Sequence, residues 1–181
     1  MIAENGFFHS PVSAIAARAG VADGTVYLYF KSKDQILRTA IDTAFLHFFE
    51  RAREEMATTE DAAQQLRILV RLHLETLAAN HALAVVMQTE VRQSARFIAE
   101  FSRQHLVDYL NLTREVIRRG QQQGIFRPDV SDRTVAHCLF GALDEMVSSW
   151  VFTERPFEPG TTASQVLDII FRGIETQSNH A

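Results

Sequence analysis

Residues 10–33 read SPVSAIAARAGVADGTVYLYFKSK, and this pattern predicts two short helices joined by a tight turn. Ile15 and Ala19 recur at helical spacing and give the first helix a small apolar face. Gly20 can adopt a positive φ and is therefore expected to end that helix. Val26 is turned inward from the second helix by the same spacing. The stretch is predicted to be a helix-turn-helix.

The second helix, expected from Ala22 to Leu28, carries polar residues outside. Thr25 and Tyr27 place hydroxyl groups on a surface that solvation alone would fill with Lys or Glu. A helix of this length fits the major groove of DNA, where Thr can touch a base edge or a thymine methyl group and Tyr can donate to phosphate oxygens. The residue types therefore favour a surface that reads DNA.

The residues ENGF at 4–7 and IAARAGVADGTVYLYFKSK at 15–33 resemble the DNA-binding domain of the TetR family of bacterial repressors. That resemblance implies binding to double-stranded operator DNA by a homodimer. Tyr29 and Phe30 have a second interpretation, as core residues between the motif and the next helix. The resemblance implies DNA contacts at His9, Ser10, Gly24, Thr25, Tyr27, Tyr29 and Lys33.

The motif departs from the family pattern in two places. Asp23 puts a negative charge at the start of the second helix, which suits the helix dipole but not a phosphate, so it is expected to point aside. The chain begins only a few residues before Asn5 and Gly6, which should end the first helix, so that helix is largely missing. Either the chain is part of a longer product or the domain is unusually short. We favour the first, because three small helices barely hold a core even when complete.

Composition leaves a DNA-binding function open. The chain has 181 residues, 46% of them hydrophobic, and a formal net charge of −4. Local charge matters more to DNA than net charge, and Lys31, Lys33 and Arg38 cluster just after the second helix. The single cysteine, Cys138, excludes a disulfide within the chain and fits a reducing compartment. No apolar run approaches the roughly 20 residues that cross a bilayer, so a soluble cytoplasmic protein without a membrane partner is expected.

The remainder of the chain shows helical periodicity, and no stretch alternates long enough to propose a strand. Ser32 is expected to cap a long helix from Lys33 to about Met56. The prediction is an all-α chain with a helix-turn-helix DNA-binding domain at 1–32 and a six-helix effector-binding and dimerisation domain at 33–181. The later helices are expected to end near Ala79, to include Leu83–Val91, to run from 93 to about 124, and to span Ser131–Phe152 and Thr162–Thr176, with Pro156, Pro159 and Gly160 in the last loop.

The last two helices resemble half of the four-helix dimer bundle of the TetR plan. Gly141 and Gly173 lie inside them at a cost of about 1 kcal/mol each, which suggests close approach of another helix. Either glycine could instead be incidental. Together with Trp150 and Ile170, these glycines form the predicted dimer interface.

Thirteen phenylalanines are many for this length, and an aromatic stripe can be plain core or the wall of a ligand pocket. MQTEVRQSARF at 87–97 and FGALDEMVSSWV at 140–151 resemble the fatty-acid-degradation regulators of the same family, the FadR-type repressors released from DNA by long-chain acyl-CoA. That resemblance favours an effector site with arginines at the phosphates of coenzyme A, although a solvated face explains the arginines nearly as well. The predicted effector residues are Phe45, Phe48, Phe49, Met87, Arg92, Arg96, Phe97, Phe101, Arg103 and Phe140.

The sequence gives little support to an enzyme. It shows no nucleophile beside a plausible His and acid, no glycine-rich phosphate loop after a strand and no di-iron spacing of Glu and His. Asp144, on an apolar helix, is expected at an interface or at a pocket rim. No catalytic residue, metal or cofactor is predicted. The alternatives are a TetR-type repressor that senses a drug-like or other hydrophobic molecule, and a helical lipid-binding protein that does not bind DNA.

Overall fold

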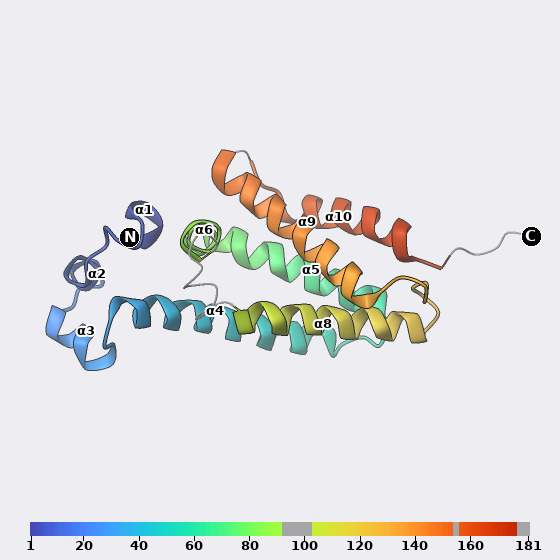
Figure 1. Cartoon of the computed structure of the whole chain (residues 1–181), viewed down its shortest axis with the longest axis horizontal. Helices are drawn as coiled ribbons and strands as arrows, with labels where there is room; N and C mark the ends of the chain where they lie inside the picture. Colours follow the sequence, from blue (N-terminus) through green and yellow to red (C-terminus); the bar gives the residue numbers. More distant parts are fainter. Residues whose placement is uncertain (92–102, 154–155, 177–181) are drawn as a thin grey trace, which may run out of the picture.

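The computed structural model describes residues 1–91, 103–153 and 156–176, and within these ranges the chain is built from helices. Figure 1 shows three short helices forming a small unit at one end of an elongated molecule, and α4 leading from this unit into a larger bundle. The only pairing of extended backbone in the described ranges is an isolated bridge between Phe126 and Glu175. The all-α prediction is confirmed. The helices are α1 (Ile2–Asn5), α2 (Val12–Arg18), α3 (Asp23–Tyr29), α4 (Lys33–Met56), α5 (Ala62–Ala79), α6 (His81–Val86), the π-helical turn η1 (Met87–Val91), α8 (Arg103–Gln122), α9 (Asp132–Thr153) and α10 (Pro159–Ile174).

The predicted helix-turn-helix is present as α2 and α3. Gly20 ends α2 with a φ of 72°, which glycine adopts without steric cost. Ala16 of α2 is fully buried and Val26 of α3 is 9% exposed, so both face inward as the spacing predicted. Asp23 lies in the first turn of α3, beside the positive end of the helix dipole.

The long helix α4 has the predicted limits. Ser32 Oγ accepts a hydrogen bond from the backbone N–H of Gln35 at 3.2 Å, and Gln35 Oε1 accepts one from the backbone N–H of Lys31 at 2.7 Å. These two bonds satisfy donors at the start of the helix that have no partner within it. The helix therefore begins at a fixed point directly after the DNA-reading motif.

The buried apolar residues form two clusters. The larger lies within the bundle and joins α4, α5, α8, α9 and α10. The smaller joins the small unit to the bundle, because Phe7 from the unit packs with Leu37 and Ile41 of α4. Val86 and Val91 complete this smaller cluster, which therefore joins the segment after α1, helix α4 and the α6–η1 segment.

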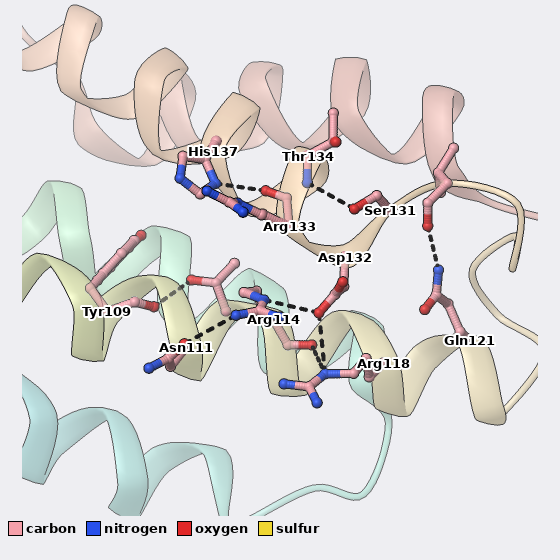
Figure 2. Close-up of polar contacts among 12 residues, drawn as sticks. Tyr109, Asn111, Arg114, Arg118, Gln121, Ser131, Asp132, Arg133, Thr134 and His137 are labelled. Carbon is pink, nitrogen blue, oxygen red and sulfur yellow. Dashed lines mark hydrogen bonds and ion pairs between the residues drawn. The ribbon is translucent and has the colours of Figure 1, made fainter.

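Ion pairs fix the connection between α8 and α9. Figure 2 shows Arg114 and Arg118 of α8 reaching the same carboxylate, that of Asp132 at the start of α9, at 3.0 and 3.2 Å. Ser131 Oγ accepts from the backbone N–H of Thr134 at 3.4 Å, which agrees with the predicted start of this helix. The start of α9 is thus held against α8.

Two predicted helix limits differ from the structure. Pro159 and Gly160 were expected in a loop, but they form the first turn of α10, where proline loses no hydrogen bond because its N–H would be unpaired anyway. Residues 87–91 form a π-helical turn in place of a continuous α-helix. The predicted start of the next helix, at residue 93, lies outside the described residues.

Close approach within the chain occurs at Gly120. A Cβ atom there would lie 2.1 Å from a ring carbon of Phe126, which is fully buried. By contrast, a Cβ atom at Gly141 or Gly173 would meet nothing within 4 Å among the described residues. The two glycines predicted to lie at an interface therefore face open space in the single chain.

Candidate functional site

The candidate DNA-reading surface is the outer face of α3, at the end of the molecule away from α10 in Figure 1. Tyr27 is 58% exposed and Tyr29 is 73% exposed, so Tyr29 belongs to the surface and not to the core. Gly24 and Thr25 are also exposed on α3, and His9 is exposed before α2. Five of the predicted DNA residues are therefore accessible to a ligand.

Ser10 and Lys33 lie differently from what the resemblance implied. Ser10 is fully buried, and its Oγ donates to the backbone carbonyl of Gly6 at 2.8 Å, so the prediction of a DNA contact through this side chain is corrected. The ammonium group of Lys33 donates to the carbonyls of Phe7 and Phe8 and lies 4.4 Å from the centre of the Phe7 ring. Both side chains supply partners to backbone carbonyls between α1 and α2.

The bundle encloses a cavity of about 270 Å³ between α4, α5, η1, α8 and α9. Phe45, Phe48, Met87 and Phe140, all predicted effector residues, line its wall. Most of the wall is apolar, as a site for a hydrocarbon chain requires. The other lining residues are Ala44, His73, Thr76, Leu77, Leu83, Gln88, Val91, Leu106, Tyr109 and Asp144.

Two further predicted effector residues, Phe49 and Arg103, do not line this cavity. Phe49 is buried in the core and packs edge-on against Phe48, with ring centres 5.4 Å apart. Arg103 is exposed at the first residue of α8 and does not line the cavity. The predicted Arg92, Arg96, Phe97 and Phe101 lie outside the described residues.

Polar side chains meet on one part of the cavity wall. Gln88 Nε2 donates to Asp144 Oδ1 at 2.8 Å, and Asp144 thus lies at the pocket, one of the two places expected for it. His73 lies edge-on to Tyr109, with ring centres 5.3 Å apart. Burial lowers the pKa of His73 to about 4, against the opposing effect of the Asp144 charge, so the imidazole is neutral at neutral pH.

His73 and Tyr109 also line the cavity and are not among the predicted effector residues. The sequence could have indicated them, because each is a polar side chain at a position whose helical spacing predicts burial. Gln88 was missed because one amide in a short helix carries no spacing pattern.

The cavity wall is joined directly to the helix that supports the DNA-binding unit. His105 of α8 stacks on Phe45 of α4, with ring centres 4.4 Å apart and planes 9° from parallel. His105 Nε2 also lies 2.7 Å from Asp42 Oδ1, one turn earlier on α4. A change at the cavity can therefore reach α4 through adjacent contacts.

The described helices carry neither a membrane span nor a cluster of metal-binding side chains. None of these helices is long and apolar enough to cross a membrane. No group of three side chains that could hold a metal ion occurs within residues 1–91, 103–153 and 156–176.

Comparison with known proteins identifies the family. Residues 1–40 match the family described as "Bacterial regulatory proteins, tetR family", and residues 42–173 match "YsiA-like protein, C-terminal region". The chain belongs to the TetR family, whose members are transcriptional regulators and not enzymes.

Among its relatives are regulators of fatty-acid metabolism. The chain is 35% identical to the fatty acid metabolism regulator protein of Bacillus subtilis, with 98% of this chain and 91% of the relative covered. It is similar in structure to the fatty acid degradation regulator FadR of Bacillus halodurans, with a TM-score of 0.89, 36% identity, and 95% and 89% coverage. It is equally similar to FadR of Bacillus subtilis in complex with stearoyl-CoA, with a TM-score of 0.88, 36% identity, and 96% and 94% coverage.

His73 should make stability depend on pH. Its pKa is about 4 in the folded chain and about 6.5 when exposed, so the unfolded chain binds the proton first as the pH falls. The stabilisation is complete above pH 6.5 and is lost as the pH falls towards 4, with a slope of up to about 1.4 kcal/mol per pH unit. Urea unfolding between pH 6.5 and 4 should show a shallower slope for His73→Phe than for the wild type.

His47→Gln, on the exposed side of α4, is the matched control and should keep the wild-type slope. Equal slopes for His73→Phe and the wild type would contradict a neutral buried imidazole.

Proposed function

We propose that this protein represses genes of fatty-acid metabolism and is released from operator DNA by long-chain acyl-CoA. The main support for this proposal is that one helix, α4, both forms a wall of the apolar cavity and packs against the DNA-binding unit. Burial of hydrocarbon stabilises a bound chain by roughly 0.8 kcal/mol per CH₂ group. The stearoyl-CoA complex of a relative at 36% identity supports this class of effector. Because its partner is the chromosome of a bacterium, the proposed place of action is the cytoplasm.

The proposed DNA contacts are the exposed groups of the α3 face. Thr25 is assigned to base edges, Tyr27 and Tyr29 to phosphates, and Gly24 to close approach of the backbone. His9 is proposed to meet the neighbouring strand. Lys31, exposed two residues after Tyr29, replaces Lys33 as the proposed phosphate-binding cation, since the Lys33 ammonium is bound to the turn before α2.

Substitution of these residues should distinguish side chains that contact DNA from side chains that stabilise the fold. Lys31→Ala should lower the salt slope of operator affinity by about one unit, whereas Lys33→Ala should lower the thermal midpoint and leave the slope unchanged. Tyr27→Phe should lower the affinity for all DNA sequences alike, and Thr25→Val should change the preference between DNA sequences. Fluorescence anisotropy over a salt series measures the operator affinities and their salt slopes, and thermal denaturation measures the midpoint. A salt slope that falls with Lys33→Ala would return that residue to the DNA contacts.

The proposed dimer forms through α9 and α10. Ile169 is 71% exposed and lies one helical turn before Gly173, so the two share a face. Gly141 on α9 likewise leaves room for a partner helix. Trp150 and Ile170 stay in the proposed interface. Within the chain Trp150 also stacks on Phe157, with ring centres 4.9 Å apart, and Ile170 is partly buried against the core.

A charge on this face should separate the subunits. Ile169→Arg and Gly141→Arg should each give a monomer in sedimentation velocity, because an unpaired charge would be buried at the interface. Leu46→Arg, which alters an apolar side chain of similar exposure on α4, should leave the dimer intact. A dimer that survives both of the first two changes would place the interface elsewhere.

The proposed switch is a displacement of α4. A chain inserted beside Phe45 and Phe48 would move α4 and change the distance between the two recognition helices of the dimer. Half-sites one turn apart on DNA require a separation of about 34 Å, so a small mismatch breaks one set of phosphate contacts. Coupling of about 1–3 kcal/mol, or about 5- to 150-fold in affinity, is usual for such switches.

Reciprocity supplies the test. If stearoyl-CoA weakens operator binding, operator DNA must weaken stearoyl-CoA binding by the same factor. Calorimetric titration of the protein with stearoyl-CoA should therefore give about 5- to 150-fold lower affinity in the presence of operator DNA. Absence of binding would refute the acyl-CoA assignment, and equal affinity in both titrations would leave the ligand without a regulatory role.

A further inference from the structure

The hydroxyl group of Tyr109 is the unusual feature of the cavity wall. Tyr109 is 3% exposed, and its hydroxyl oxygen has no hydrogen-bond partner among the described residues. A buried polar group without a partner is costly and marks a place where something further binds. Tyr109 lines the cavity, but its hydroxyl oxygen has almost no accessible surface, so a molecule in the cavity reaches it only if a neighbouring ring shifts.

Neighbouring rings hold Tyr109 in place. Its ring centre lies 5.3 Å from that of His73, 5.6 Å from that of Phe140 and 5.9 Å from that of Phe48. These rings come from α5, α9 and α4, and Figure 2 shows Tyr109 projecting from α8. Its backbone is also held in a regular helix, where its carbonyl accepts from Thr113 Oγ1 at 2.9 Å. A side chain confined on three sides presents its hydroxyl in one orientation.

The hydroxyl is available as a donor. Burial raises the pKa of Tyr109, so the group keeps its proton at neutral pH. The neighbouring carboxylate of Asp144 accepts a bond from Gln88. The hydroxyl therefore suits a ligand that brings an acceptor oxygen into an apolar cavity.

An acyl-CoA has one such oxygen at the start of its hydrocarbon chain. The chain itself carries only carbon and hydrogen, whereas the thioester that joins it to coenzyme A carries a carbonyl oxygen. An apolar wall that includes an unpaired hydroxyl group suits a hydrocarbon chain that ends in a carbonyl group.

We propose that Tyr109 donates a hydrogen bond to the thioester carbonyl oxygen of the bound acyl-CoA and so determines how far the chain enters the cavity. This inference rests on the proposed function and specifies which residue of the same site recognises the thioester group. It makes Tyr109 a specificity residue that distinguishes an acyl thioester from an equally long alkyl chain.

The test compares two ligands and two proteins. Stearoyl-CoA and S-octadecyl-CoA have the same number of chain carbons, but the second is a thioether that lacks the carbonyl oxygen. Tyr109→Phe should bind stearoyl-CoA about 3- to 10-fold more weakly than the wild type does, while both proteins should bind S-octadecyl-CoA equally. Calorimetry on the full chain measures the four affinities.

The ligand-free melting temperature separates recognition from folding. Because the hydroxyl bonds to no described group, Tyr109→Phe should melt at the wild-type temperature or above it. Equal loss of affinity for both ligands, no loss for either, or a lower melting temperature in the variant would overturn the assignment. If the wild type fails to bind stearoyl-CoA at all, the proposed function fails with it; if the wild type binds and Tyr109→Phe binds equally well, only the role of Tyr109 fails.

Discussion

The packing of Phe45 connects the two parts of the molecule. Its ring packs against both hydrophobic clusters, lines the cavity and stacks on His105 of α8. Because α4 is one uninterrupted helix, displacement of this ring acts on the helix that supports the DNA-binding unit. The bundle helices whose residues line the cavity lie away from α3, and α4 leads from the unit that contains α3 into this bundle (Figure 1). A displacement of α4 at the cavity is therefore expected to move the DNA-binding unit as well.

Local chemistry allowed much of the fold to be predicted. The capping pair Ser32 and Gln35, the helical spacing of α5 and the turn at Gly20 depend on neighbours in sequence, so their limits agree with the structure. The first turn of α10 was missed because Pro159 and Gly160 usually mark a loop. Proline is also favoured at the first helical position, and sequence alone did not distinguish the two roles.

The candidate site was less accessible from sequence. Phe45, Phe48, Met87 and Phe140 were assigned by resemblance and do line the cavity, whereas Phe49, at an adjacent position, faces the core. A stripe of apolar residues does not reveal which of its members border a hollow, because the hollow depends on helices from distant parts of the chain. The ammonium group of Lys33 illustrates the same limit, since its acceptors lie more than twenty residues earlier.

The bonds of Lys33 also determine how the DNA-binding unit can respond. Lys33 is the first residue of α4, and its ammonium group donates to the carbonyls of Phe7 and Phe8, in the connection between α1 and α2. The chain enters α4 from α3, and α4 is held to the same unit at two further places, by the bonds of Lys33 and by the packing of Phe7 with Leu37 and Ile41. A connection through the chain alone would let the unit rotate about the start of α4. The two added contacts oppose that rotation, so we expect α2 and α3 to move as one body with α4.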